Sequence, residues 1–176
     1  MKKFVYILSV ILFAQIALGQ SKNYDIVIYG GTSSGVAAAI QSSRMGKSTL
    51  LIEPTNRIGG LTTGGLGQTD IGNKQAIGGI SREFYENIKK YYDNLANWKW
   101  QKKTEYLDGG QTRTEENENS MWTFEPSAAL AVYKEMLAHE NVTLIYNERL
   151  NREKGVLKKN GKIKSIETES GKTFSG

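Results

Sequence analysis

Short apolar runs alternate with amphipathic stretches in the first part of the chain. The β-rich run 24–29 ends in a glycine turn at 30–35, an Ala-rich helical stretch follows over 36–44, and a nearly all-apolar run covers 48–53. Continuous apolar strands are typical of parallel sheets that are covered on both faces. Two parallel strands joined by a helix make a right-handed βαβ unit. The pattern therefore predicts an α/β fold with a parallel sheet.

The middle of the chain predicts two more helices and a third parallel strand. Residues 57–79 are rich in Gly and short polar side chains and indicate an extended loop. A helix is expected over 80–95, where apolar side chains recur at helical spacing: Phe84, Ile88, Tyr91 and Leu95. An irregular insertion is expected over 97–123. Pro126 then opens an amphipathic helix over 127–140, and a strand follows over 142–146.

From Gly155 the pattern becomes antiparallel. Two short strands flank the Asn160-Gly161 pair, which is a strong hairpin signal. A second turn at Ser170-Gly171 leads into the beginning of a third strand. We expect residues 155–176 to form the start of a β-meander, with an unpaired edge from Lys172 onward. Residues 20–154 are therefore expected to form the N-terminal part of a larger domain, and the meander at 155–176 is expected to be truncated. The apolar faces of the helices beginning at Ile80 and Ser127 are then expected to lack a partner.

The first 19 residues predict a secretory signal peptide. Lys2 and Lys3 precede an uncharged run, and Ala17-Leu18-Gly19 offers the small residues that a signal peptidase accepts, so mature protein is expected to begin at Gln20. A membrane anchor is the alternative, but the apolar run is shorter than the ~20 residues that span a bilayer. The absence of Cys excludes lipoprotein processing. Export to the periplasm or medium is expected, without a stable anchor afterwards.

Composition narrows the function classes further. Removal of the leader takes Lys2 and Lys3, so the formal charge falls from +5 to +3, and the basic residues are scattered rather than clustered. This does not favour a nucleic-acid partner. With no Cys and one His, His139, no thiol nucleophile or His-rich metal cluster is available, and no metal site is expected. His139 itself is expected to be a solvated cation at a helix end.

The glycine turn carries the candidate chemistry. A dinucleotide-binding turn needs one Gly for the bend, a second for close approach of the pyrophosphate, and a third for helix–strand packing. Gly30 and Gly35 fill the first and third places, and Thr32 stands in the middle place beside Gly31. A hydroxyl at Thr32 could bond a phosphate oxygen. Glu53 lies 18 residues after Gly35, at the end of the next strand, where an acid can accept hydrogen bonds from a ribose.

A second glycine-rich stretch favours a flavin over a nicotinamide. Arg57-Ile58-Gly59-Gly60 follows the second strand, and Thr63-Gly64-Gly65-Leu66-Gly67 comes soon after. With the turn 30–35, Glu53, the Thr69-Asp70 pair and the Phe124-Glu125-Pro126 helix start, these motifs resemble FAD-dependent oxidoreductases of the glutathione-reductase-like fold, in an exported bacterial branch. The resemblance covers most of 24–176. It implies a Rossmann-like parallel sheet with an antiparallel β-meander, here apparently incomplete.

The resemblance also implies a role for each matching position. The pyrophosphate would lie against Gly30, Gly31, Gly35 and the backbone of Thr32, Ser33 and Ser34. Glu53 would bind the adenosine ribose, and Arg57, Gly59 and Gly60 would flank the adenosine diphosphate. Gly64, Gly65 and Leu66 would approach the ribityl chain and the flavin ring. Leu150, just after the third strand, matches a position whose backbone meets the adenine edge.

The function expected is hydride or electron transfer between FAD and a small organic substrate, for instance a sugar or hydroxy acid. No residue stands out as acid, base or nucleophile, and the oligomeric state is open. An NAD(P)-dependent dehydrogenase is one alternative; a truncated nucleotide-binding fragment without turnover is another. The Trp and Tyr residues of 91–106 could line a substrate cleft, but packing of the insertion is the preferred interpretation.

Overall fold

The computed structural model describes residues 23–67, 71–107, 109–115 and 117–176. The predicted leader at 1–19 and the Thr69-Asp70 pair lie outside the described residues. Within the described ranges, no helix has the length and apolar character needed to cross a membrane.

The predicted parallel sheet is confirmed. Its strands are β1 (Ile26–Tyr29), β2 (Thr49–Glu53) and β3 (Val142–Tyr146), in the order β1-β2-β3. All pairs are parallel. The helix α2 (Ser33–Arg44) connects β1 to β2. The βαβ unit therefore forms at the residues where the pattern of apolar runs predicted it.

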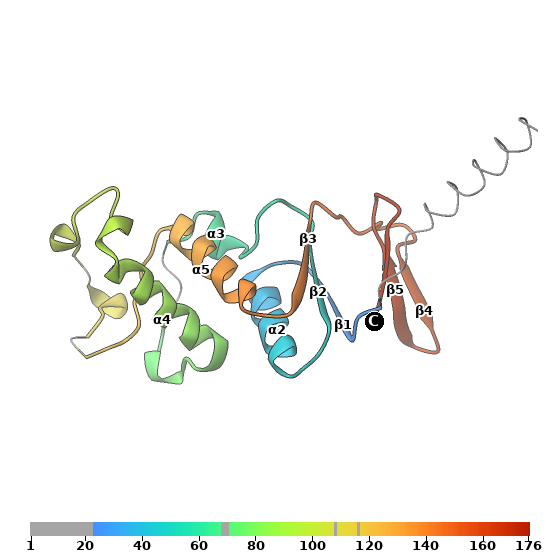
Figure 1. Ribbon diagram of the computed structural model, residues 1–176, viewed down its shortest axis with the longest axis horizontal. Helices are drawn as coiled ribbons and strands as arrows, with labels where there is room; N and C mark the ends of the chain where they lie inside the picture. Colours follow the sequence, from blue (N-terminus) through green and yellow to red (C-terminus); the bar gives the residue numbers. More distant parts are fainter. Residues whose placement is uncertain (1–22, 68–70, 108, 116) are drawn as a thin grey trace, which may run out of the picture.

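Helices cover one face of this sheet and the meander covers the other (Figure 1). On the helical side, Leu51 joins the main core with α2, α4 (Gly79–Asp93) and α5 (Pro126–Ala138). On the opposite side, Leu50 and Ile52 pack with Phe174 of the meander. Because successive strand residues point to opposite faces, the continuous apolar run of β2 serves two cores.

The predicted meander is confirmed as an antiparallel sheet of β4 (Val156–Lys159), β5 (Lys162–Glu167) and β6 (Thr173–Ser175). Asn160 and Gly161 have φ of 52° and 76°, as the tight hairpin turn between β4 and β5 requires. The expected unpaired edge after Lys172 is partly wrong. Ser175 forms a parallel bridge with Asn23, and its carbonyl accepts a 3.1 Å hydrogen bond from the Tyr24 amide.

The expectation that two helical faces lack a partner is also wrong. The apolar face of α4, including Phe84 and Ile88, packs against that of α5, including Val132 and Tyr133. The rings of Phe84 and Tyr133 stack with centroids 4.5 Å apart. These faces cover each other because both helices lie on the same side of the sheet.

Two local boundaries differ from the sequence pattern. Leu95 was expected on the buried face of the helix, but α4 ends at Asp93 and Leu95 is 69% exposed. The reason is Asn94, whose side chain accepts a hydrogen bond from the Ala96 amide and so caps a new 3₁₀ turn at Leu95–Asn97. The glycine-rich loop also contains a short helix, α3 (Leu61–Gly64), and a 3₁₀ turn at Lys74–Ala76.

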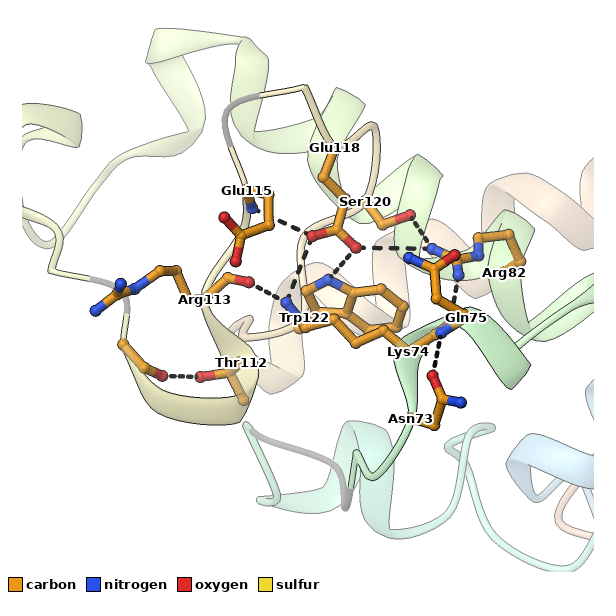
Figure 2. A network of polar contacts seen from close by, with 11 residues as sticks. Asn73, Lys74, Gln75, Arg82, Thr112, Arg113, Glu115, Glu118, Ser120 and Trp122 are labelled. Carbon is orange, nitrogen blue, oxygen red and sulfur yellow. Dashed lines mark hydrogen bonds and ion pairs between the residues drawn. The ribbon is translucent and has the colours of Figure 1, made fainter.

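The insertion at 97–123 is irregular, as predicted, with 3₁₀ turns at Lys103–Glu105 and Gly110–Thr112. Figure 2 shows how its end is anchored. The fully buried Trp122 has two cations near its ring, since the charged groups of Lys74 and Arg82 lie 5.5 and 5.0 Å from the ring centroid. The Glu118 carboxylate accepts a 2.8 Å hydrogen bond from Trp122 Nε1 and pairs with both cations. The insertion is thereby held against α4.

Candidate functional site

The turn between β1 and α2 depends on two glycines. Gly30 has φ of +104°, a conformation that other residues rarely adopt. A Cβ on Gly35 would lie 2.0 Å from the carbonyl oxygen of Gly30. The first turn of α2 therefore packs directly on the end of β1, and only glycine fits at the third position of the motif.

Thr32 has a structural role of its own as the N-cap of α2. Its Oγ1 accepts a 3.2 Å hydrogen bond from the Gly35 amide and lies 2.9 Å from Ser34 Oγ. Such a cap satisfies one of the amides that have no partner within the helix. This explains why Thr is compatible with the middle position of the turn. A bond from this hydroxyl to a phosphate stays a prediction.

The carboxylate of Glu53 is hydrogen-bonded to the glycine turn. Its Oε2 accepts a 2.7 Å hydrogen bond from the Gly31 amide, and its Oε1 accepts bonds of 2.8 and 2.6 Å from the amide and hydroxyl of Thr55. The side chain is buried, with 6% exposed. A Cβ on Gly31 would lie 2.9 Å from this carboxylate. A carboxylate has about four lone-pair sites, so three internal bonds leave capacity for a ribose hydroxyl.

The second glycine-rich stretch joins the first by hydrogen bonds. The Gly59 amide donates to the Gly31 carbonyl over 2.6 Å, and Ser33 Oγ donates to the Gly59 carbonyl over 2.9 Å. Gly59 and Gly60 have φ of +95° and +55°. Arg57 Nε donates to the Thr63 carbonyl over 2.7 Å, so this side chain holds the loop. The structure thus brings together the turn 30–35, Glu53 and the segment 57–60.

The remaining predicted positions lie at the margins of this group. Leu66 is half exposed, and its amide donates to the Leu61 carbonyl over 3.1 Å, just after α3 ends at Gly64. Gly65 has φ of +147°. The Leu150 amide donates a 2.9 Å hydrogen bond to the hydroxyl of Tyr29, the last residue of β1. That amide is therefore engaged within the protein, and the adenine contact at Leu150 stays a prediction.

A cavity of about 300 Å³ opens beside the first turn of α2, and sequence reasoning missed two of its residues, Thr62 and Tyr133. Thr62 Oγ1 lies 2.8 Å from Ser33 Oγ. Burial raises the pKa of the Tyr133 phenol above its usual range, so the group stays neutral. The sequence carried a weak signal only, since Tyr133 follows the apolar spacing of α5 and looks like an ordinary core residue.

This geometry fits an adenine dinucleotide on three counts. The N-terminus of α2 presents backbone amides, which attract phosphate. The crowding at Gly31 and Gly35 shows that the turn packs directly on the Glu53 side chain and on the end of β1, as the glycine motif requires. A buried acid ends the neighbouring strand. Together they define a Rossmann-like dinucleotide-binding fold.

The comparisons agree with this class. A family profile described as FAD dependent oxidoreductase matches residues 25–176. The chain therefore belongs to the FAD-dependent oxidoreductase family, and FAD is its cofactor. The match to the FAD-dependent family favours FAD over the NAD(P) alternative.

Solved structures support the same fold. The 3-ketosteroid-Δ4-(5α)-dehydrogenase from Rhodococcus jostii RHA1, in complex with 4-androstene-3,17-dione, aligns with a TM-score of 0.51 and 16% identity over 91% of this chain. An oxidized steroid monooxygenase bound to NADP aligns with a TM-score of 0.51 and 15% identity over 88% of it. The chain spans 45% and 25% of these two proteins. At this identity the likeness concerns the fold alone.

Proposed function

We propose that this chain forms the FAD-binding part of an exported oxidoreductase that moves a hydride or electrons between a small organic substrate and FAD. The observation that carries the proposal is the hydrogen bond of 2.7 Å between the Gly31 amide and the buried Glu53. This bond joins the phosphate-binding turn to the expected ribose acceptor in one rigid unit. Such preorganisation lowers the cost of ordering a flexible dinucleotide.

Each part of the site then has a task. The amides of Thr32 to Ser34 at the start of α2 would hold the pyrophosphate, Glu53 would accept from the ribose, and the segment 57–60 would flank the adenosine diphosphate. The Gly64–Leu66 segment would pass beside the ribityl chain. The bound flavin supplies the redox chemistry, and the protein supplies position and electrostatics.

Cofactor identity is tested on the full-length protein after reconstitution with FAD or FMN. We expect the flavin absorbance bands to remain after gel filtration with FAD only. Glu53→Lys should weaken this retention, because it places a cation where ribose hydroxyls need an acceptor and also removes the bonds to Gly31 and Thr55. Retention of FMN, or equal retention of FAD by the variant, would contradict the assignment.

Export is proposed from the residues at the N-terminus, where a charged start precedes an apolar run and a small-residue cleavage site. Cell fractionation followed by N-terminal sequencing tests it. We expect mature protein outside the cytoplasm that begins at Gln20. Intact Met1 in a membrane fraction would favour the anchor instead.

A further inference from the structure

A second cavity, of about 240 Å³, lies between the insertion and the start of α5. Its wall includes Gly67, the last residue of the loop expected at the flavin end of the cofactor. The Phe124 amide donates to the Gly67 carbonyl over 2.9 Å, and a Cβ on Gly67 would lie 2.7 Å from the Phe124 carbonyl. The cavity therefore borders the loop that is expected at the flavin end of the cofactor.

One side of the cavity is a continuous aromatic wall. The rings of Tyr92 and Trp98 have centroids 5.0 Å apart, and those of Trp98 and Tyr106 are 5.4 Å apart. Trp98 Nε1 donates a 2.7 Å hydrogen bond to the Tyr92 carbonyl, which fixes the indole. Trp100, 85% exposed, also lines the cavity. The planes of these ring pairs are inclined to each other by 54° and 59°, so the three inner rings pack as one tilted aromatic cluster along this side of the cavity.

Polar groups line the same cavity. The Tyr92 hydroxyl donates to Glu125 Oε2 over 3.0 Å and accepts from the Glu125 amide over 3.0 Å. Burial raises the pKa of Tyr92 above its usual range, and the adjacent Glu125 carboxylate adds to the effect, so the phenol keeps its proton. Tyr92 thus orients the carboxylate while using only one of its about four lone-pair sites.

The lining of the cavity carries charges of both signs. Lys99 and Glu125 both line the cavity, together with the amide side chains of Asn97 and Gln101. A cationic ligand would be repelled by Lys99, and an anionic ligand would be repelled by Glu125. A neutral ligand with several hydroxyls can accept from the ammonium and donate to the carboxylate. Its apolar C–H face can lie on the amphipathic Trp and Tyr rings.

The cavity volume limits the size of the ligand, since pockets for drug-sized molecules measure about 300–1,000 Å³. We propose that this cavity binds a neutral, monosaccharide-sized, polyhydroxylated ring as the substrate of the flavin site. The assignment of this ligand as the substrate rests on the proposed function. The rings of the insertion then have two uses, because they pack against each other and also form the wall.

The test is titration of the FAD-reconstituted full-length protein with D-glucose and with D-galactose, followed by Trp fluorescence and calorimetry. Choline and lactate are the cationic and anionic probes. We expect saturable binding of at least one hexose and about tenfold weaker binding of both charged probes. Trp100→Ala and Glu125→Gln should each weaken hexose binding about tenfold. Their matched controls are Leu107→Ala, an exposed apolar residue of the same insertion, and Glu135→Gln, an exposed acid of α5.

The outcomes separate this inference from the proposed function. If FAD is retained but neither hexose binds, or if choline or lactate binds more tightly, the substrate class is wrong. Equal hexose affinity in Trp100→Ala and its control would place the ligand elsewhere and overturn the site. Displacement of the flavin by hexose would show that the cavity belongs to the cofactor, which also overturns it. Hexose binding without any retention of FAD would overturn the proposed function and leave the binding site standing.

Discussion

The backbone amide of Gly31 and the carboxylate of Glu53 are joined by a buried 2.7 Å hydrogen bond across the ends of β1 and β2. The partners are 22 residues apart in the sequence. The acid at the end of the second strand therefore shapes the turn that follows the first strand, in addition to any contact with a ribose. Loss of this acid should affect the fold as well as the cofactor.

Glu53→Gln is expected to lower the free energy of unfolding by about 1–3 kcal/mol, the cost of an unsatisfied buried polar group. Both carboxylate oxygens accept hydrogen bonds, from Gly31 on one side and Thr55 on the other. An amide can accept on only one side and would direct a donor at the other. Urea unfolding without FAD measures the loss. Glu135→Gln is the control, and equal stability of the two variants would show that the internal bonds of Glu53 are dispensable.

Gly35→Ala is expected to destabilise the chain by about 1–3 kcal/mol, the usual range for overpacking. The new methyl group would lie 2.0 Å from the Gly30 carbonyl oxygen, so α2 must move away from β1. FAD retention should fall with it, because the amides at the start of α2 move too. Gly72→Ala is the matched control, since its methyl group meets no atom within 4 Å. A Gly35→Ala protein with the same melting temperature as the Gly72→Ala control would contradict the close packing.

Thr32→Ala should cost about 1 kcal/mol of stability in the absence of FAD, because it removes the N-cap of α2. Thr32→Ser should retain most of the stability that the N-cap contributes, since Ser keeps the hydroxyl that accepts from the Gly35 amide. Thermal melting of the three proteins gives the comparison. A Ser variant as unstable as the Ala variant would mean that the methyl group of Thr32 matters rather than its hydroxyl.

The stability of the helical layer should depend on pH through Glu83. Arg44 of α2 forms a bidentate pair with this carboxylate, with distances of 2.6 and 2.8 Å, and also binds Glu140 at 2.6 Å. The hydrogen bonds from Arg44 hold the pKa of Glu83 below its ordinary value of 4.5. The stabilisation is therefore complete above about pH 4.5 and is lost as the pH falls through the lower, folded-state pKa.

Glu83→Gln should lose about 0.2–1 kcal/mol at pH 7, since the pair is partly exposed to solvent. The difference from the unsubstituted protein should shrink toward pH 3. Urea unfolding at several pH values measures this difference. A constant difference from pH 7 to 3 would show that the ion pair contributes nothing.

The amino-acid sequence by itself predicted the order and type of most elements. The strands at 26–29, 49–53 and 142–146, the helices around them and the Asn160-Gly161 hairpin follow from local patterns. Period, glycine placement and capping residues act on the backbone over a few neighbouring positions, so they can be read without the fold. The same holds for the turn at 30–35 and its acid, whose spacing is local to one βαβ unit.

Tertiary structure alone decided which side chains meet. It joined the Glu53 carboxylate to the Gly31 amide, brought Tyr133 to the cavity beside Ser33, and packed α4 against α5. Glu53 was expected only as a ribose acceptor, the two helical faces were expected to lack a partner, and no role was expected for Tyr133. It also gathered Gly67, Trp98 and Glu125 around one cavity. These contacts join residues from separate elements, and their geometry follows from how the elements pack. Local backbone preferences carry no information about such distant partners, because packing is settled only when the whole core closes.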